Sequence, residues 1–323
     1  MWSWLKSLFG ASTPKNETYL PPYTKQVIDI KAMSETIDWG IKSLGIPDIW
    51  KDTQGEDIKV AVLDTGVAMN HPDLKDSIVA SKDFTGGDNP QDGNGHGSHC
   101  SGIVAARAND VGVVGVAPKA QIIGGKVLSD GGYGSIEWIV NGINWAVEQG
   151  ADIISMSLGS RYPDADLEKA VRHAIDNNRI VIAAAGNDGS GSNTINYPGG
   201  YEDVICVGSI NSDKERSNFS STGPNITIMA PGEDVLSCYP PDQYATFSGT
   251  SMATPFIAGV AALILAKHRK LGGKTPCENQ KQMLEHLIRC ADDMEGEGRD
   301  NTTGWGLVNP RKSLEHEHGG GNA

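Results

Sequence analysis

The sequence predicts an α/β protein with a mostly parallel sheet that helices cover on both faces. From Trp39 onward, short apolar segments rich in Val and Ile alternate with longer segments of helical spacing. Strands that are apolar along their whole length are typical of parallel sheets, because helices bury both faces of such a sheet. Polar residues follow several of these segments, at the sheet edge where α/β proteins carry their functional sites.

The expected elements follow in order along the chain. Short runs of β-branched and other apolar residues predict buried strands at 59–64, 120–127, 152–157, 179–185 and 203–208. Helices are expected where apolar residues recur every three or four positions, at 135–148, 164–177 and 254–270. The last of these is apolar on all sides, so we expect it to be buried.

Composition indicates a globular protein without a nucleic-acid partner. Of its 323 residues, 38% are hydrophobic and 21% are charged, as in folded domains. The formal net charge of −13 disfavours contact with a phosphate backbone. Solubility alone accounts for this acidic excess, and calcium-binding carboxylates are the second interpretation. The five cysteines are odd in number and lack CxxC spacing, so we expect free thiols in a reducing cytosol.

The two ends of the chain differ from the main domain expected at 35–312. Residues 1–34 form an extension whose first ten residues are apolar but interrupted by Ser3, Lys6 and Ser7, unlike a signal peptide. We therefore expect a cytoplasmic protein with no segment that spans a bilayer. A short helix that docks on a membrane or partner is the alternative to a frayed terminus. The polar tail 313–323 is expected to be disordered.

Three glycine-containing segments carry the chemistry: VAVLDTG, GHGSH and GTSMATP. In chain order they supply Asp64, His96 and Ser251. Nucleophilic hydrolysis needs a hydroxyl, a base that takes its proton and a carboxylate that orients the base. Taken singly, the three residues read as a turn former, a surface histidine and a helix N-cap. Together and in this order they favour a catalytic triad.

Local context adds detail to this hypothesis. His96 lies between two glycines, which predicts a helix start with an exposed imidazole, and the Thr65 hydroxyl is expected to bond the Asp64 carboxylate. Asn187 follows an apolar strand in the segment AAAGNDG. Its side-chain amide and the Ser251 backbone N–H are candidate donors to a tetrahedral oxyanion, and a plain turn residue is the alternative for Asn187.

With Asn187 added, these segments resemble the subtilisin-like serine proteases (peptidase S8 family), from about Glu35 to Pro310. The resemblance implies a three-layer α/β/α sandwich and an endopeptidase that forms an acyl-enzyme. It makes Asp64, His96 and Ser251 the triad and Asn187 the oxyanion donor. It also places the thiol of Cys100 beneath the triad. Intracellular subtilisins are the most similar branch.

The resemblance also implies how substrate binds. Two segments, Gly132-Tyr133-Gly134 and Ser157-Leu158-Gly159, would pair with an extended peptide, which is backbone recognition. The pocket for the residue before the cleaved bond would be lined by Ser157 to Gly159, Ala184 to Gly186 and Asn196. We expect no acidic residue at its base, and hence broad specificity with an apolar or aromatic preference.

Calcium is the expected cofactor, again by resemblance. The ligands implied for a tight site are Glu35, Asp73, Arg107, Asn109, Val111 and Val113, as side-chain oxygens or carbonyls. A second, weaker site would use carbonyls of Gly199, Tyr201 and Val204, after a cis Tyr197–Pro198 bond. A plain glycine-containing loop is the alternative interpretation of the first site.

The extension contains YLPPYTKQV at 19–27, which resembles the short inhibitory segment of intracellular subtilisins. Leu20, Pro21, Pro22 and Tyr23 would lie across the active site, where a proline kink holds the peptide bond away from Ser251. Self-cleavage near 31–35 would then release a propeptide spanning 1–34. An inert tail is the alternative. The partners expected are protein or peptide substrates and the chain's own extension, with a homodimer left open.

Two other functions compete with proteolysis as interpretations of the sequence. A catalytically silent relative that acts as a binding protein is the main alternative, although the chain retains all four of the residues that a protease needs. Nucleotide binding is excluded, because Gly124-Gly125-Lys126 lacks Walker spacing and no GxGxxG opens a helix. Of the tail residues, His316 and His318 are at most adventitious metal ligands.

Overall fold

A computed structural model describes residues 17–28, 34–272 and 277–316. Its centre is a seven-stranded sheet in the order β12-β11-β10-β9-β4-β7-β5, and all neighbouring strands are parallel. The strands are β4 (Lys59–Asp64), β5 (Ile78–Asp83), β7 (Gln121–Lys126), β9 (Ile153–Met156), β10 (Ile180–Ala184), β11 (Ile205–Ile210) and β12 (Ile228–Pro231). This sheet confirms the parallel α/β fold.

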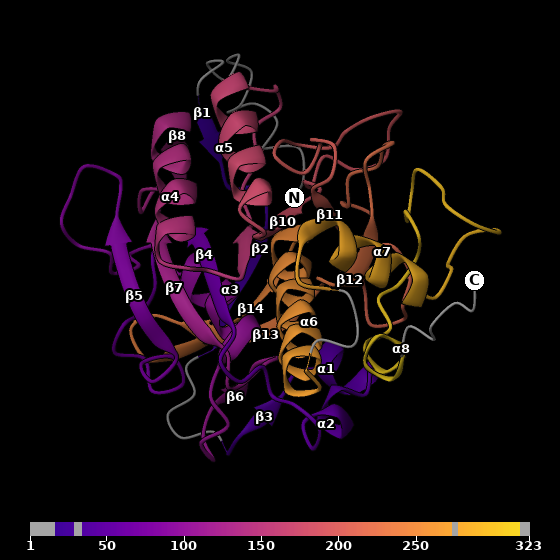
Figure 1. Cartoon of the computed structure of the whole chain (residues 1–323). Helices are drawn as coiled ribbons and strands as arrows, with labels where there is room; N and C mark the ends of the chain where they lie inside the picture. Colours follow the sequence, from indigo (N-terminus) through magenta and orange to yellow (C-terminus); the bar gives the residue numbers. More distant parts are fainter. Residues whose placement is uncertain (1–16, 29–33, 273–276, 317–323) are drawn as a thin grey trace.

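Helices cover both faces of the sheet (Figure 1). One layer holds α4 (Ile136–Glu148) and α5 (Ala165–Asp176), and the other holds α3 (His96–Ala105) and α6 (Thr250–Lys270). Along β4 the side chains alternate between the layers: Val60 and Val62 belong to the core around α6, whereas Ala61 and Leu63 belong to the core under α4 and α5. The three-layer α/β/α sandwich is therefore confirmed.

The remaining elements surround these layers. The helices are α1 (Trp39–Ser43), α2 (Ile46–Ile49), α7 (Gln280–Cys290) and α8 (Pro310–Glu315). The strands are β1 (Glu17–Tyr19), β2 (Thr24–Ile28), β3 (Thr36–Ile37), β6 (Val113–Val114), β8 (Tyr133–Ser135), β13 (Val235–Tyr239) and β14 (Gln243–Ser248). Helix α8 corrects the boundary of the polar tail, because Ser313 and Leu314 are helical and buried. Residues 317–323, with His318, lie outside the described part of the chain.

Helix α6 begins four residues earlier than its apolar pattern predicts, so that Pro255 lies inside it. Pro255 has no N–H to donate to the carbonyl of Ser251, one turn earlier. Two side chains replace the missing donor: the Ser157 hydroxyl donates to that carbonyl at 2.8 Å and the Cys100 thiol at 3.4 Å. The helix therefore tolerates proline at a point where three elements meet.

Among the described helices, α6 is long and apolar enough to cross a membrane, which corrects the expectation that no segment has that composition. Its most apolar window is 94% buried inside the protein. Such burial is that of a core helix.

A close approach of α6 to the loop after β6 gives a test of this packing. A Cβ added at Gly259 would lie 2.5 Å from the Cβ of Val116. Alanine has the higher helix propensity, by about 1 kcal/mol, but overlap in a packed core costs about 1–3 kcal/mol. We expect Gly259→Ala to lower the free energy of unfolding, measured by denaturant titration in a Ser251→Ala background. Adding Val116→Ala should recover part of the loss, and an unchanged stability for Gly259→Ala would contradict the packing.

Candidate active site

Three elements bring the candidate catalytic residues together. Asp64 ends β4, His96 begins α3, and Ser251 lies in the first turn of α6. The His96 Nδ1 atom lies 2.8 Å and 3.0 Å from the two carboxylate oxygens of Asp64, and all three residues are fully buried. The backbone N–H of Thr65 also donates to Asp64, at 2.7 Å. This carboxylate therefore orients the imidazole and fixes Nδ1 as its proton-bearing atom.

The Ser251 hydroxyl is not hydrogen-bonded to His96 in this structure. It donates to the carbonyl of Ser157 at 3.4 Å, while the His96 Nε2 atom is buried without a hydrogen-bond partner among the described residues. Burial is the largest single effect and acts to lower the pKa of His96, but the charge and hydrogen bond of Asp64 together with those of Cys100 outweigh it, and the pKa is raised well above its ordinary value. The imidazole and the hydroxyl are thus close in the fold without being bonded to each other.

The imidazole is covered, which corrects the expectation that it is exposed. The ring of Tyr23 lies 4.9 Å from the His96 ring, centroid to centroid, and 5.1 Å from the ring of Phe247. The Tyr23 hydroxyl donates to the side chain of Asn94 at 3.2 Å. An aromatic residue of the extension therefore shields His96 from solvent.

The Thr65 hydroxyl also differs from expectation, because it donates to Asp92 at 2.9 Å and not to Asp64. Asp92 further accepts bonds from Asn94, Gly95 and Ser98 at 2.6–2.9 Å. These bonds tie the start of α3 to the strand end that carries Asp64. Sequence reasoning missed Asp92, for which the one available signal was an acidic residue just before a helix start.

Asn187 is held in a single orientation. Its side-chain oxygen accepts from the N–H and the hydroxyl of Thr250, at 2.9 Å and 2.8 Å. Its Nδ2 therefore faces the active site, where it donates to the carbonyl of Pro22 at 2.7 Å. A backbone carbonyl of the extension occupies the place at which this amide would meet a substrate.

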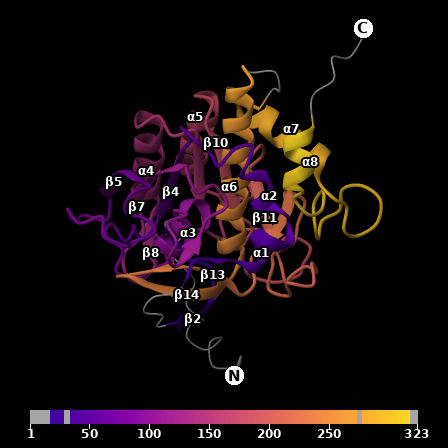
Figure 2. The same ribbon diagram turned by 90° about the horizontal axis from the view of Figure 1, so that it is seen from below.

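Residues 17–23 of the extension lie between the two segments that are expected to bind substrate. β1 pairs antiparallel with β8, and Tyr19 exchanges two 3.0 Å backbone hydrogen bonds with Gly159 on the other side. The N–H of Leu20 donates to the carbonyl of Gly132 at 3.1 Å. Beyond Tyr23, β2 pairs antiparallel with β14 (Figure 2). The extension thus crosses the site as two short strands, β1 and β2, joined by residues 20–23.

The residues expected to line the pocket lie together, with one addition. A Cβ on Gly186 would lie 2.3 Å from the amide nitrogen of Asn196, and a Cβ on Gly159 would lie 2.8 Å from its Cβ. Asn196 accepts from the Tyr19 hydroxyl at 3.1 Å and donates to Asp188 at 2.9 Å. The expectation of no acidic residue concerns the base of the pocket and stays a prediction, because Asp188 is described here only through its contact with Asn196. Asp188 is paired with Arg161 at 3.1 Å, a contact for which its sequence neighbourhood gave no signal.

The first expected calcium site forms one cluster of hard oxygen donors. The Asp73 carboxylate accepts from Asn109 at 3.1 Å and from the N–H of Val113 at 2.9 Å, and Glu35 accepts from the N–H groups of Asn109 and Asp110. The backbone N–H of Arg107 donates to the carbonyl of Asp73 at 2.9 Å. Two carboxylates, an amide and a carbonyl-rich loop suit calcium by their chemistry, and Tyr244, a further partner of Asp73 at 3.0 Å, was missed.

The second expected calcium site is a tight turn. The Tyr197–Pro198 bond is cis, as expected, and Tyr201 donates its N–H back to Pro198 at 3.0 Å. The backbone N–H of Val204 donates to the carbonyl of Tyr201 at 3.4 Å. The turn therefore brings Gly199, Tyr201 and Val204 close together.

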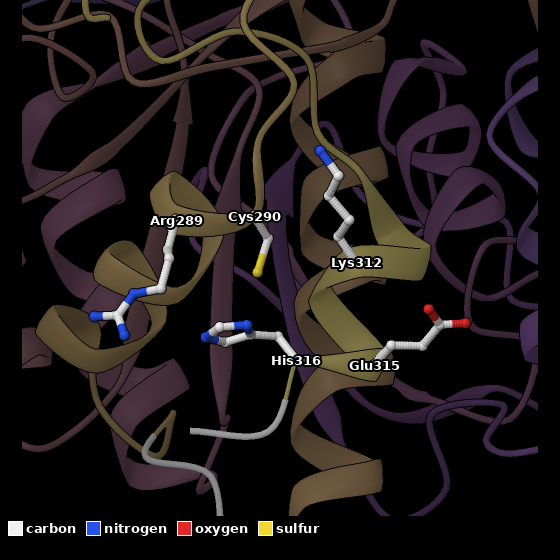
Figure 3. A pocket seen from close by; sticks show the side chains of 5 residues that line it. All are labelled: Arg289, Cys290, Lys312, Glu315 and His316. Atoms are coloured by element: carbon white, nitrogen blue, oxygen red, sulfur yellow. The ribbon is translucent and has the colours of Figure 1, made fainter. Parts of the chain in front are cut away.

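Two hollows lie away from these residues. One, of about 260 Å³, is lined by Arg289, Cys290, Lys312, Glu315 and His316, between α7 and α8 (Figure 3). The other, of about 780 Å³, lies between α4 and α5 and is lined by both polar and apolar residues. Neither includes a residue of the Asp64–His96–Ser251 cluster.

Comparison with known proteins gives a consistent result. Residues 55–306 match the model of the subtilase family. The chain is 43% identical over 296 residues to an intracellular serine protease of Paenibacillus polymyxa, which covers 88% of this chain and 90% of that protein. It is 44% identical over 260 residues to the major intracellular serine protease of Bacillus subtilis (strain 168), covering 77% and 80%. It is 40% identical over 282 residues to thermitase of Thermoactinomyces vulgaris, covering 86% and 96%.

Proposed function

Because this chain belongs to the subtilase family and is a subtilisin-like serine endopeptidase, we propose that Asp64, His96 and Ser251 are its catalytic triad. The observation that carries the assignment is the contact of His96 Nδ1 with both Asp64 oxygens. A proton held on Nδ1 leaves the lone pair of Nε2 to act as the base. This Nε2 atom is buried and has no hydrogen-bond partner among the described residues, and in the neutral imidazole it takes the Ser251 proton once the hydroxyl rotates away from Ser157.

In the proposed mechanism, the Ser251 oxygen attacks the substrate carbonyl while His96 Nε2 takes its proton. The Asp64 carboxylate stabilises the imidazolium that forms, and the Asn187 amide donates to the developing oxyanion. His96 then gives the proton to the leaving amine. In the second half of the reaction, water attacks the acyl-enzyme while His96 takes its proton, and His96 returns that proton to the Ser251 oxygen. The Pro22 carbonyl on Asn187 supports this role, because it shows the amide aimed at a peptide oxygen.

The extension is proposed to inhibit the enzyme, with residues 1–34 as propeptide and 35–312, extended by α8, as catalytic domain. Pro21 has no N–H, so the Ser157 carbonyl accepts from the Ser251 hydroxyl instead, which directs the nucleophile's proton away from His96. Tyr23 covers His96 at the same time. The proposed self-cleavage region, 31–35, lies mostly outside the described residues.

Specificity is proposed to be broad, with an apolar or aromatic preference. Recognition through Gly132, Gly159 and their neighbours uses backbone groups that any extended peptide offers. The charge of Asp188 is balanced by Arg161 beside the pocket, which supports neutral rather than cationic side chains there. We also propose a cytoplasmic protein that binds calcium, in line with the names of its intracellular relatives and the oxygen-rich cluster around Asp73. A homodimer stays open to measurement.

Reaction with a fluorophosphonate tests the triad. We expect the full chain to be labelled at Ser251, and labelling to be lost in Ser251→Ala. Mass spectrometry of the same two preparations should find a shorter chain, cut near 31–35, in the parent protein only. A parent chain that folds, stays uncut and resists labelling would point to a catalytically silent relative.

Truncation of the ring that covers His96 tests inhibition. We expect Tyr23→Ala to raise the initial peptidase rate of the uncut chain about two- to tenfold, since an aromatic contact and its buried area are lost. Rates are measured in the first minutes, with mass spectrometry confirming that the chain is intact. Val79→Ala, which shortens an exposed apolar side chain on β5, serves as the control. Equal initial rates for Tyr23→Ala and the parent would argue for an inert extension.

Chelation tests calcium. In the Ser251→Ala background, we expect a chelator to lower the thermal midpoint by about 5–10 °C, since saturating ligand stabilises by about 3 kcal/mol. Calcium in excess should restore the midpoint, whereas magnesium should not. Asp73→Asn should lower the midpoint without chelator and make it insensitive to chelator. A parent midpoint indifferent to chelator would leave the loop as a plain structural turn.

A further inference from the structure

We propose that β14 is a docking edge for the part of a substrate that follows the cleaved bond, reaching to the sixth residue beyond it. We propose also that Tyr239 favours a basic side chain at the third of these positions. Both inferences rest on the proposed function, because they extend the binding of a peptide that the triad cleaves.

The first observation is the strand that covers β14. β2 pairs antiparallel with β14 over five consecutive residues, from Thr24 opposite Ser248 to Ile28 opposite Tyr244. The sheet order is β13-β14-β2, so β14 is internal only while β2 is present. When the extension leaves, β14 has an unpaired edge of backbone donors and acceptors, which readily accepts another extended strand.

The second observation fixes the register of that edge relative to the catalytic residues. The carbonyl of Pro22 accepts from Asn187, so the bond between Pro22 and Tyr23 takes the place of the cleaved bond. Thr24 is then the second residue beyond it and Ile28 the sixth. β14 itself runs directly into Gly249 and Ser251, so a strand paired with it is aligned with the nucleophile.

The third observation is a side-chain contact at one position. The ammonium of Lys25 lies 4.4 Å from the centroid of the Tyr239 ring and donates to its hydroxyl. The other β2 side chains with described surroundings, Thr24, Gln26 and Val27, are exposed. Backbone pairing is therefore the main source of binding along this edge, and among the described surroundings of β2 Tyr239 is the side chain whose contact distinguishes residue types.

Tyr239 is held rigidly enough to act as such a platform. Its ring packs against Gly95, where an added Cβ would lie 2.0 Å from the nearest ring carbon. Its hydroxyl donates to the Asn94 carbonyl at 3.3 Å, which leaves the oxygen free to accept from an ammonium. Phe247 meets the ring edge to face at 6.2 Å. With a formal net charge of −13, the protein also favours a cation there.

The test compares internally quenched peptides that are identical before the cleaved bond. The first peptide has two residues after the cleaved bond. Two others have six residues there, with either Lys or Glu at the third position. The last is the six-residue Lys peptide with N-methylated amides at the fourth and fifth positions. The full chain is used as purified. Because the extension competes equally with every peptide, the ratio of two kcat/KM values is independent of how much of the enzyme is uncovered.

We expect the six-residue Lys peptide to exceed the two-residue peptide in kcat/KM on the order of tenfold, the effect of about two net backbone hydrogen bonds. N-methylation should remove most of that gain. The kcat/KM of the Lys peptide should exceed that of the Glu peptide about two- to fivefold in the parent and in Tyr239→Phe, which keeps the ring. In Tyr239→Leu, the two peptides should have nearly equal kcat/KM values. The two-residue peptide and the thermal midpoint control for folding of both variants.

Several outcomes would overturn the proposal. A length ratio near one, with the two-residue peptide cleaved normally, would refute the docking edge and leave the proposed function intact. A length gain that N-methylation leaves unchanged would show that side chains, not strand pairing, bind the substrate. A Lys preference that persists in Tyr239→Leu would exclude Tyr239 as its source. If no peptide is cleaved and Ser251 resists the fluorophosphonate, the proposed function and this inference fail together.

Discussion

The parallel pairing of β4 with β7 and β9 is the constraint on which the rest of the site depends. Parallel register brings the carboxyl ends of these strands to one edge, where Asp64 ends β4 and Ser157 follows β9. The same edge receives the first turns of α3 and α6, which carry His96 and Ser251. A one-residue slip of β4 would turn Asp64 to the opposite face of the sheet, so the apolar alternation that fixes the register also fixes the carboxylate.

A few polar groups around Ser251 hold several elements together. Pro255 leaves the carbonyl of Ser251 without its helical donor, and Ser157, just after β9, and Cys100 of α3 supply donors instead. That carbonyl thus joins α6 to α3 and to the end of β9. Burial raises the pKa of the Cys100 thiol, which keeps it protonated as a donor. Burial likewise lowers the pKa of His99 to about 3, so this neighbour of His96 stays neutral and adds no second positive charge.

The extension uses the same physics as a substrate would, on both sides of the nucleophile. β1 lies between β8 and the segment at Gly159, β2 adds to β14, and the two prolines and Tyr23 join them across the triad. In the proposed inhibition, backbone pairing gives the extension affinity without demanding a particular sequence, and the proline removes the N–H that a substrate would offer to Ser157. On this proposal, the extension differs from a substrate by a few atoms near Ser251.

The sequence by itself determined the fold class and the four candidate catalytic residues. Apolar periodicity predicted five of the seven strands of the main sheet, and the helices α4, α5 and α6, to within a few residues, but it missed β5 and β12. The glycine-containing segments around Asp64, His96 and Ser251 identified themselves, because these signals are local along the chain. Only the tertiary structure decided that Tyr23 buries His96, that Asp92 ties α3 to β4, that Asp188 lies beside Asn196, and that β2 pairs with β14. Each of these contacts, except that between Asp188 and Asn196, joins segments far apart in sequence. No repeating pattern in the sequence signals these contacts. They are therefore decided by packing and topology, which composition and residue spacing do not reveal.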